Sequence, residues 1–303
     1  MAIVTTGSFS KALWPGVNAW YGKEYDEYSV EWDKLFDKYT SRKAFEEDVG
    51  ITSYGLAQIK PEGAAVAYDT ERQTFITRYT HVNYALGFII TQEMFDDDLY
   101  DVVAERRARG LAFSMRQTKE TVGANVYNRA FNTSFTFGDG VSLVNSAHKN
   151  AIGGTFSNTL ATNANISEAA LEQACIDISR FTNDRGLKIR VTPESIHLPP
   201  EQMFEIERIL KSQYRVGTAN NDISALVSMG KFKNGVHVNH YFTSTTAWFI
   251  RTDCPDGMKY FERKGDSFGE DNDFDTGNAK FKAQARYSFG NTDPRAIYGA
   301  QGF

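Results

Sequence analysis

With 303 residues, 41% of them hydrophobic and 23% charged, the chain has the composition of an ordinary globular protein with one large or two moderate domains. Its formal net charge of −5 gives no global reason to bind nucleic acid or an anionic membrane, and no apolar run approaches the ~18 residues of a membrane-spanning helix. The N-terminus lacks the basic and long apolar regions of a secretory signal, so we expect a chain that is soluble and intracellular when it is synthesised. In that compartment the two cysteines, Cys175 and Cys254, are expected to be unpaired.

The N-terminal segment, residues 1–45, is rich in aromatic and charged side chains. Tyr28, Trp32, Phe36 and Tyr39 follow one another at helical spacing, which predicts an amphipathic helix over 27–39. Two interpretations stay open at this point. The helix packs on its own domain, or it belongs to an arm that packs on a neighbouring subunit.

Residues 50–90 are predicted to be extended, because they are rich in Thr, Tyr, Phe, Val and Ile. The polar residues 69–72 interrupt the pattern and predict the tip of a hairpin with arms over 53–68 and 73–90. Such arms are far longer than the usual strand of ~5–6 residues, and an isolated two-stranded hairpin is marginally stable in water. We therefore expect the hairpin to lie on the body of its own chain or on another copy.

Residues 92–132 are predicted to form one uninterrupted helix. Its apolar side chains recur at close to helical spacing, at Phe95, Leu99, Val102, Val103, Phe113, Val122, Val126 and Ala130. Thr91 is placed to cap the N-terminus, the aspartates at 96–98 lie near the positive end of the helix dipole, and Arg129 lies near the negative end. At about 1.5 Å per residue the helix would be roughly 60 Å long, which exceeds the width of most compact domains. This length favours a chain that reaches its neighbours over one that closes around a pocket.

The second half of the chain alternates between helices and strands after a glycine-rich, loop-like segment over 133–166 that separates the two halves. The predicted elements are a helix over 167–182 with Leu171, Ala174, Ile178 and Phe181 on one face, a short strand over 188–192, a helix over 201–212 opened by Pro199-Pro200, strands over 236–242 and 247–251, and mostly extended chain from 258. No internal repeat of 20 to 50 residues is visible.

The chain carries none of the common signatures of an enzyme: no dinucleotide-binding glycine motif, no phosphate loop, no His-Glu-x-x-His and no Gly-x-Ser-x-Gly. His237 and His240 are the closest histidine pair, but three positions apart on a strand they face opposite sides and do not share a metal ion. His148 is expected to be a surface or capping histidine, and His81 and His197 have no obvious partner. We assign no catalytic, cofactor-binding or metal-binding residue.

Two charged clusters could bind a ligand. Asp271, Asp273 and Asp275 have the 1-3-5 spacing of a calcium-binding EF-hand loop, but Thr276 and Lys282 stand where that loop needs glycine and glutamate. We therefore expect an acidic, solvated loop.

The second cluster consists of Arg106, Arg107 and Arg109 in the middle of the predicted helix. Acidic residues at 96–98 and 101 precede the arginines in the order that favours helical salt bridges. Solvated or intersubunit ion pairing is therefore the preferred interpretation over recognition of nucleic acid.

Four stretches carry a resemblance to a known family. They are PEGAAVAYDTERQTFITRYTHVNYALGFIITQEMFDDDLYD (61–101), GVSLVNSAHKNAIGGTFSN (140–158), DRGLKIRVTPESIHLPPEQMFEIERILKS (184–212) and DFDTGNAKFKAQARYSFGNTDPRAIYGA (273–300). Their order and spacing resemble the major capsid protein of tailed bacteriophages with the Hong-Kong-97-type fold, and most of all the short subunits known as major head proteins, including the Mu-like ones.

The resemblance implies an α+β chain with a Hong-Kong-97-like arrangement. Its parts would be an N-terminal arm (1–48), an extended β-hairpin loop and a strand into the peripheral domain (49–90), the peripheral domain with a long spine helix (91–164), an axial domain (165–257), return strands of the peripheral domain (258–289) and a C-terminal strand (290–303).

The same resemblance implies a non-enzymatic structural protein without a cofactor. It would self-assemble into the hexamers and pentamers of an icosahedral head that encloses double-stranded DNA without sequence-specific contacts. It also implies assembly in the host cytoplasm, residence in the virion, and as partners a separate scaffolding protein, a portal and a decoration protein, with no membrane.

Two departures from the family limit what is carried over. The segment before the extended loop is too short to contain the removable scaffolding domain of some members. Some members also form a lysine–asparagine crosslink between subunits; Lys60 lies in the loop region, but no reacting pair is identified, so no crosslink is assigned.

The alternatives to a capsid protein are a soluble α/β enzyme or ligand-binding protein, and a phage tail structural protein.

Overall fold

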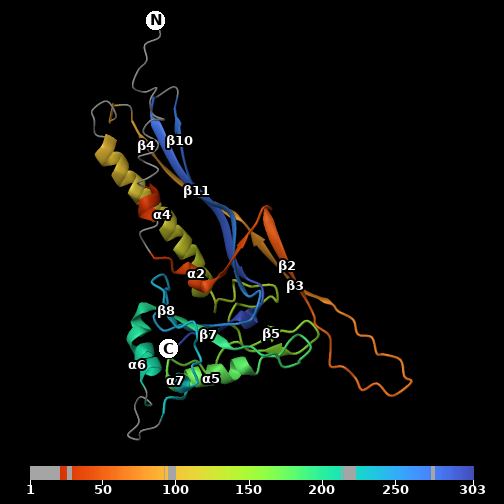
Figure 1. Ribbon diagram of the computed structural model, residues 1–303. Coiled ribbons are helices and arrows are strands. Elements are labelled where there is room, and N and C mark those ends of the chain that lie inside the picture. Colours follow the sequence, from red (N-terminus) through yellow and green to blue (C-terminus); the bar gives the residue numbers. More distant parts are fainter. Residues whose placement is uncertain are drawn as a thin grey trace.

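A long helix on a long sheet forms one end of the molecule, and a second sheet covered by helices forms the other (Figure 1). The computed structural model describes residues 21–25, 29–91, 93–94, 100–212, 214, 223–273 and 277–303. The first sheet has the order β1-β10-β11-β4, with strands β1 (Asp37–Thr40), β10 (Met258–Asn272), β11 (Ala279–Asn291) and β4 (Val82–Ile90). Its strands pair antiparallel except for β1, which runs parallel to β10.

The helix α4 (Tyr100–Asn128) has 29 residues and is about 44 Å long. It confirms the central part of the predicted helix but ends at Asn128 rather than at 132; residues 92 and 95–99 lie outside the described residues. The Thr91 hydroxyl accepts a bond from the Met94 N–H at 3.4 Å, as the predicted cap requires. In its first part α4 buries small side chains, at Ala104, Ala108 and Ala112, and further along it also buries larger ones, including Leu111, Met115 and Tyr127.

The predicted apolar stripe of this helix is wrong at Phe113, which is 43% exposed. The large apolar residues suggested a stripe, whereas the alanines at 104, 108 and 112 mark the buried side. Alanine there lets α4 lie close to β11, whose Phe281, Ala283, Ala285 and Tyr287 alternate with the polar residues of its other face.

Gly110 in the middle of α4 provides a test of helix stability. A Cβ added at Gly110 would meet nothing within 4 Å, and the residue is exposed. Gly110→Ala should therefore stabilise the subunit by about 0.5–1 kcal/mol, because glycine loses more backbone entropy in a helix. Urea unfolding measures the change. Gly123→Ala is the matched control, since its Cβ would lie 3.2 Å from that of Trp32, and an equal gain at both positions would contradict the argument.

The predicted helix over 27–39 is wrong. The chain forms only the short helix α2 (Trp32–Leu35), becomes extended at Phe36 and continues as β1 alongside β10; residues 26–28 lie outside the described residues. Trp32, Leu35 and Phe36 are all buried between α4 and the sheet. Pairing with β10 thus overrides the local helical spacing of the aromatic residues.

The predicted hairpin exists with different arms. Strand β2 (Phe45–Ile51) pairs antiparallel with β3 (Gln73–Thr80), and no residue of 52–72, all of which the structure describes, belongs to a strand. The arm expected over 53–68 is therefore wrong. The other arm, expected over 73–90, is divided at His81 into β3 and β4. The chain changes its pairing partner there from β2 to β11, and the buried His81 ring bonds Ser288 at 2.9 Å.

The second sheet has the order β12-β9-β7-β8. Its strands are β12 (Ile297–Ala300), β9 (Trp248–Thr252), β7 (Pro193–Leu198) and β8 (Val236–Val238), and its helices are α5 (Glu168–Ser179), the 3₁₀ turn η2 (Pro200–Gln202), α6 (Met203–Lys211) and α7 (Ala225–Ser228). Both long helices confirm their predictions, and Ser167 caps α5 through the Ala170 N–H. The strand expected over 188–192 instead begins at Pro193, where its pairing with β9 starts.

A buried polar cluster joins the loop-like middle segment to the C-terminal end. The middle segment contains the two-residue strands β5 (His148–Lys149) and β6 (Thr155–Phe156), and the 3₁₀ turn η3 (Pro294–Ala296) precedes β12. His148 is fully buried, contrary to its expected place at the surface, and its two ring nitrogens lie 2.6 Å from Asp139 and 3.1 Å from Asn158. The Asn158 amide donates to the carbonyls of Leu143 and Ile297. Both cysteines are free, as expected.

His197 on β7 makes the stability of the fold depend on pH. The ring is fully buried, accepts or donates a bond at 2.9 Å to the Ser195 hydroxyl and stacks on His237 with ring centroids 5.2 Å apart. Burial, followed by the neighbouring His237 and Arg251, holds the pKa of His197 well below its usual value.

Lowering the pH should therefore destabilise the subunit. The unfolded chain binds this proton near pH 6.5 and the folded chain does not, so stability that is present above pH 6.5 is lost as the pH falls. The free energy of unfolding should fall by about 1.4 kcal/mol in total between pH 7.5 and 5.5 for each such histidine, and the slope approaches about 1.4 kcal/mol per pH unit only at lower pH. Urea unfolding between pH 7.5 and 5.5 measures this slope. The variant His197→Gln should flatten it, and an unchanged slope would contradict the assignment.

Candidate assembly surfaces

The segment 52–72 is the least covered part of the described chain, and it projects away from both sheets beyond β2 and β3 (Figure 1). Ile59 is 97%, Tyr68 93% and Leu56 79% exposed, and Tyr54 and Val66 are also more than half exposed. Side chains as exposed as Ile59 and Tyr68 make little contact with their own subunit. Exposed apolar residues gathered in one segment are typical of a site that contacts another protein.

The two ends of this segment meet at a neck. The neck is closed by a bond from the Thr52 N–H to the Arg72 carbonyl and by a bond from the Arg72 N–H to the Thr52 hydroxyl, each at 2.9 Å. Beyond the neck no residue belongs to a strand, and the chain turns at residues 62–63. The hairpin below continues the apolar surface through Val49, Ile51 and Ile76, which are exposed.

The described part of the N-terminal segment packs on its own subunit, which favours the first of the two interpretations for 21–36. Glu120 of α4 accepts from the N–H groups of Glu31 at 3.1 Å and Trp32 at 2.9 Å. Burial raises the pKa of the Glu120 carboxyl. Residues 1–20, the remainder of the proposed arm, lie outside the described residues.

Lys119, the neighbour of Glu120, supports the same contact. Its side chain is almost fully buried, 3.7 Å from Asp266 and 3.8 Å from Glu262, and its ammonium lies 4.9 Å from the ring of Trp32. Burial lowers the pKa of Lys119, and the nearby carboxylates oppose that effect. The segment is thus fixed on α4 by adjacent charges of opposite sign.

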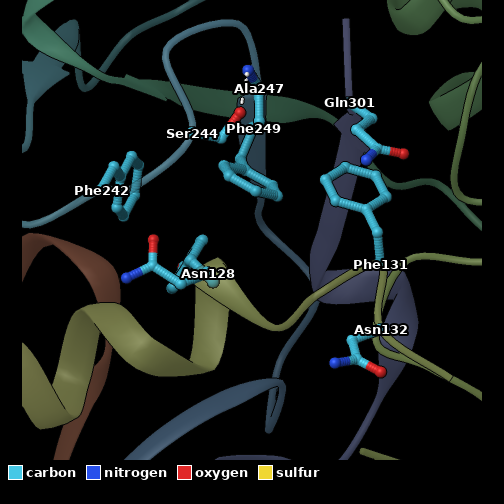
Figure 2. Close-up of a pocket in the computed structure, with 9 residues that line it drawn as sticks. Asn128, Phe131, Asn132, Phe242, Ser244, Ala247, Phe249 and Gln301 are labelled. Carbon is cyan, nitrogen blue, oxygen red and sulfur yellow. Dashed lines mark hydrogen bonds between the residues drawn. The ribbon is translucent and has the colours of Figure 1, made fainter. Parts of the chain in front are cut away.

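A pocket of about 210 Å³ lies where α4 meets the second sheet (Figure 2). Phe131, Phe242 and Phe249 form its apolar lining. Tyr127 also lines the pocket, and its hydroxyl donates to the Leu35 carbonyl at 3.0 Å. The Asn128 side chain donates to the Tyr241 carbonyl and accepts from the Thr243 N–H, so it ties α4 to the chain before β9. Its lining contains no Asp, Glu, Lys, Arg, His or Cys.

The structure keeps the candidate ligands apart. His237 stacks on His197, whereas the His240 ring bonds Glu31 at 2.6 Å. In the part of the chain that is described, no three His, Cys, Asp or Glu residues are grouped so as to hold a metal ion. Asp273 pairs with Lys280 at 2.7 Å, while Asp275 lies outside the described residues.

Two arginines of the cluster make contacts within the subunit, and one of these contacts is an ion pair. Arg109 pairs with Glu105 one turn earlier at 2.6 Å, and Arg107 donates to the Ile89 carbonyl at 2.6 Å.

No helix among the described residues has the length and apolar character needed to cross a membrane.

Comparison with known proteins identifies the family. A family model described as phage capsid protein matches residues 74–300. The chain belongs to the phage capsid protein family. It is therefore a structural shell protein and not an enzyme, which excludes the first alternative. No curated protein sequence matches the chain.

Solved structures show that the fold is the Hong-Kong-97 type. A virus-like particle from Pyrococcus furiosus matches with a TM-score of 0.54 at 11% identity, covering 94% of this chain and 98% of the other. Mycobacterium phage Che8 matches with a TM-score of 0.54 at 12% identity, covering 90% and 92%. The capsid of a native GTA particle matches with a TM-score of 0.54 at 12% identity, covering 90% and 89%.

Sequence reasoning missed two features of these surfaces. The buried cluster around His148 was missed because Asp139 and Asn158 approach it only in the folded chain. The full extent of the segment 52–72 was missed because its Tyr, Val and Ile content suggested strands. The signal that could have revealed the loop is the run of residues 61–64, Pro-Glu-Gly-Ala, which interrupts any strand.

Proposed function

We propose that this capsid protein is the major head subunit of a tailed phage, and that it self-assembles into the hexamers and pentamers of an icosahedral shell around double-stranded DNA. The observation that carries the proposal is the segment 52–72, which exposes apolar side chains, contains no strand and projects away from both sheets. Self-complementary surfaces of this kind drive closed assemblies of identical subunits.

The segment 52–72, called the extended loop below, lies in the proposed assembly on a neighbouring subunit. Burial there removes Leu56, Ile59 and Tyr68 from water, which is the main favourable term in association. Extended backbone also has free N–H and C=O groups that can pair with another chain.

The division into domains proposed from the sequence is supported by the two cores. One core lies between α4 and the first sheet, and contains Trp32, Tyr127, Tyr260 and Tyr287. The other lies between the second sheet and α5 and α6, and contains Leu171, Ile196, Ile206 and Trp248. We propose that the first is the peripheral domain and the second the axial domain.

The proposed partners outside the shell are a separate scaffolding protein, a portal and a decoration protein, and DNA is enclosed without sequence-specific contacts. The net charge of −5 supports enclosure without tight binding. We propose that assembly takes place in the host cytoplasm and that the mature protein resides in the virion.

Light scattering and negative-stain microscopy over a concentration series test the proposal. Capsomers or closed particles are expected for the purified protein, alone or with its scaffolding protein. A compact monomer under all of these conditions would overturn it.

A further inference from the structure

A turn over residues 183–187 forms side-chain hydrogen bonds to both sides of the neck of the extended loop. Arg185 donates from Nη1 to Oδ2 of Asp69 at 2.7 Å and from Nη2 to the Thr70 carbonyl at 2.5 Å. Asn183 donates from Nδ2 to the Ser53 hydroxyl at 2.8 Å on the opposite side of the neck. The grip joins residues separated by more than 110 positions in the sequence.

The turn itself is built to be rigid. The Asn183 side-chain carbonyl accepts from the N–H groups of Arg185 at 3.0 Å and Leu187 at 2.9 Å, and the Asn183 N–H donates to the Leu187 carbonyl at 2.8 Å. Gly186 has φ +76°, a left-handed conformation that glycine adopts without strain. The Arg185 guanidinium is therefore presented from a fixed backbone.

Asp69 is held just as firmly on the side of the loop. One carboxylate oxygen accepts from the Gly55 N–H at 2.8 Å, and the other accepts from the Thr70 N–H at 2.8 Å. These backbone bonds, and after them Arg185, keep the pKa of Asp69 below its usual value. The carboxylate thus links both sides of the neck to the turn.

We propose that the turn 183–187 is a clasp that sets the direction in which the extended loop leaves the subunit, which makes Arg185 and Asp69 positioning residues for assembly. This inference rests on the proposed function. Below the neck the loop is supported by the two-stranded hairpin β2–β3, which alone is a weak support. A loop already pointed at its partner loses less conformational freedom on docking, so the clasp speeds assembly.

The clasp contributes little to the stability of the fold. The Arg185 side chain is 18% and the Asp69 side chain 42% exposed, and ion pairs at the surface are weak. A loss of the clasp should therefore be visible in the loop and in assembly rather than in the melting temperature. This separates a positioning role from a merely structural one.

The test compares Arg185→Ala with Arg190→Ala, a matched control that removes the same charge from an exposed position in the same segment. Cleavage by chymotrypsin at Tyr54 and Tyr68 in the unassembled subunit reports the freedom of the loop. Arg185→Ala should raise the cleavage rate about two- to fivefold, the change expected from the loss of one exposed ion pair, and should slow assembly in light scattering. Arg190→Ala should change neither.

Two further variants keep the test decisive. Asp69→Asn removes the charge at nearly constant size and should raise cleavage as Arg185→Ala does, even if one variant folds poorly. Arg185→Lys should fail to restore protection, because a point charge does not reproduce the two-pronged guanidinium contact. Equal cleavage and equal assembly rates in the wild type, Arg185→Ala and Asp69→Asn would overturn the clasp. A wild type that never assembles would instead overturn the proposed function, since the cleavage result is independent of assembly.

Discussion

Replacing residues 56–68 by two glycines should leave a folded subunit that no longer forms particles. The deleted residues are exposed and belong to neither core, so their loss should change the free energy of unfolding by only about 0.5 kcal/mol. The cut keeps Gly55 and Asp69 and stops before Gln73, where β3 begins. Circular dichroism and urea unfolding check the fold, and light scattering and microscopy check assembly.

The control for this deletion is Ala64→Ser, a polar change on the exposed loop that should assemble normally. Two outcomes would count against the account. If the deleted chain were unfolded, the loop would belong to the core of its own subunit. If the folded deletion variant still formed normal particles, the loop would not provide the contacts between subunits.

A proline at Ala112 should have the largest effect on stability. Ala112 is fully buried in the middle of α4, and proline removes the hydrogen bond of its N–H and clashes with the preceding turn, at a cost of ~3 kcal/mol or more. The helix should kink where it lies on the sheet, and the subunit should unfold at lower urea or fail to form closed particles.

Gly110→Ala is the matched control, because it lies two positions away on the exposed side of the same helix and should stabilise it. Gln117 on the same helix is unsuitable as a control, because it is only partly exposed and its side chain bonds Tyr241. Normal closed particles from Ala112→Pro would contradict a continuous helix that supports the shell.

Local patterns predicted the elements whose stability is itself local. Helix α5 has its cap at Ser167 and its apolar face at Leu171, Ala174 and Ile178, and all of these were visible in the sequence. The order of the predicted elements also indicated the capsid family, because a long loop followed by a very long helix is an unusual combination.

The errors occur where a distant partner decides the conformation. Residues 37–40 form a strand instead of the predicted helix because β10 offers an edge to pair with, and β10 lies more than 200 positions away. The prediction of the buried side of α4 was wrong because the side chains at 104, 108 and 112 pack against the sheet. Small side chains are needed there, and this requirement depends on residues distant in the sequence. The clasp between Arg185 and Asp69 joins two turns that in sequence look like ordinary polar loops.

The most direct test of the central claim is a cryo-electron microscopy reconstruction of the particles that the wild-type chain forms. We predict a closed icosahedral shell in which density for residues 54–68 lies on an adjacent subunit and covers Leu56, Ile59 and Tyr68. A reconstruction in which this segment lies on its own subunit, or a protein that forms no shell, would contradict the account.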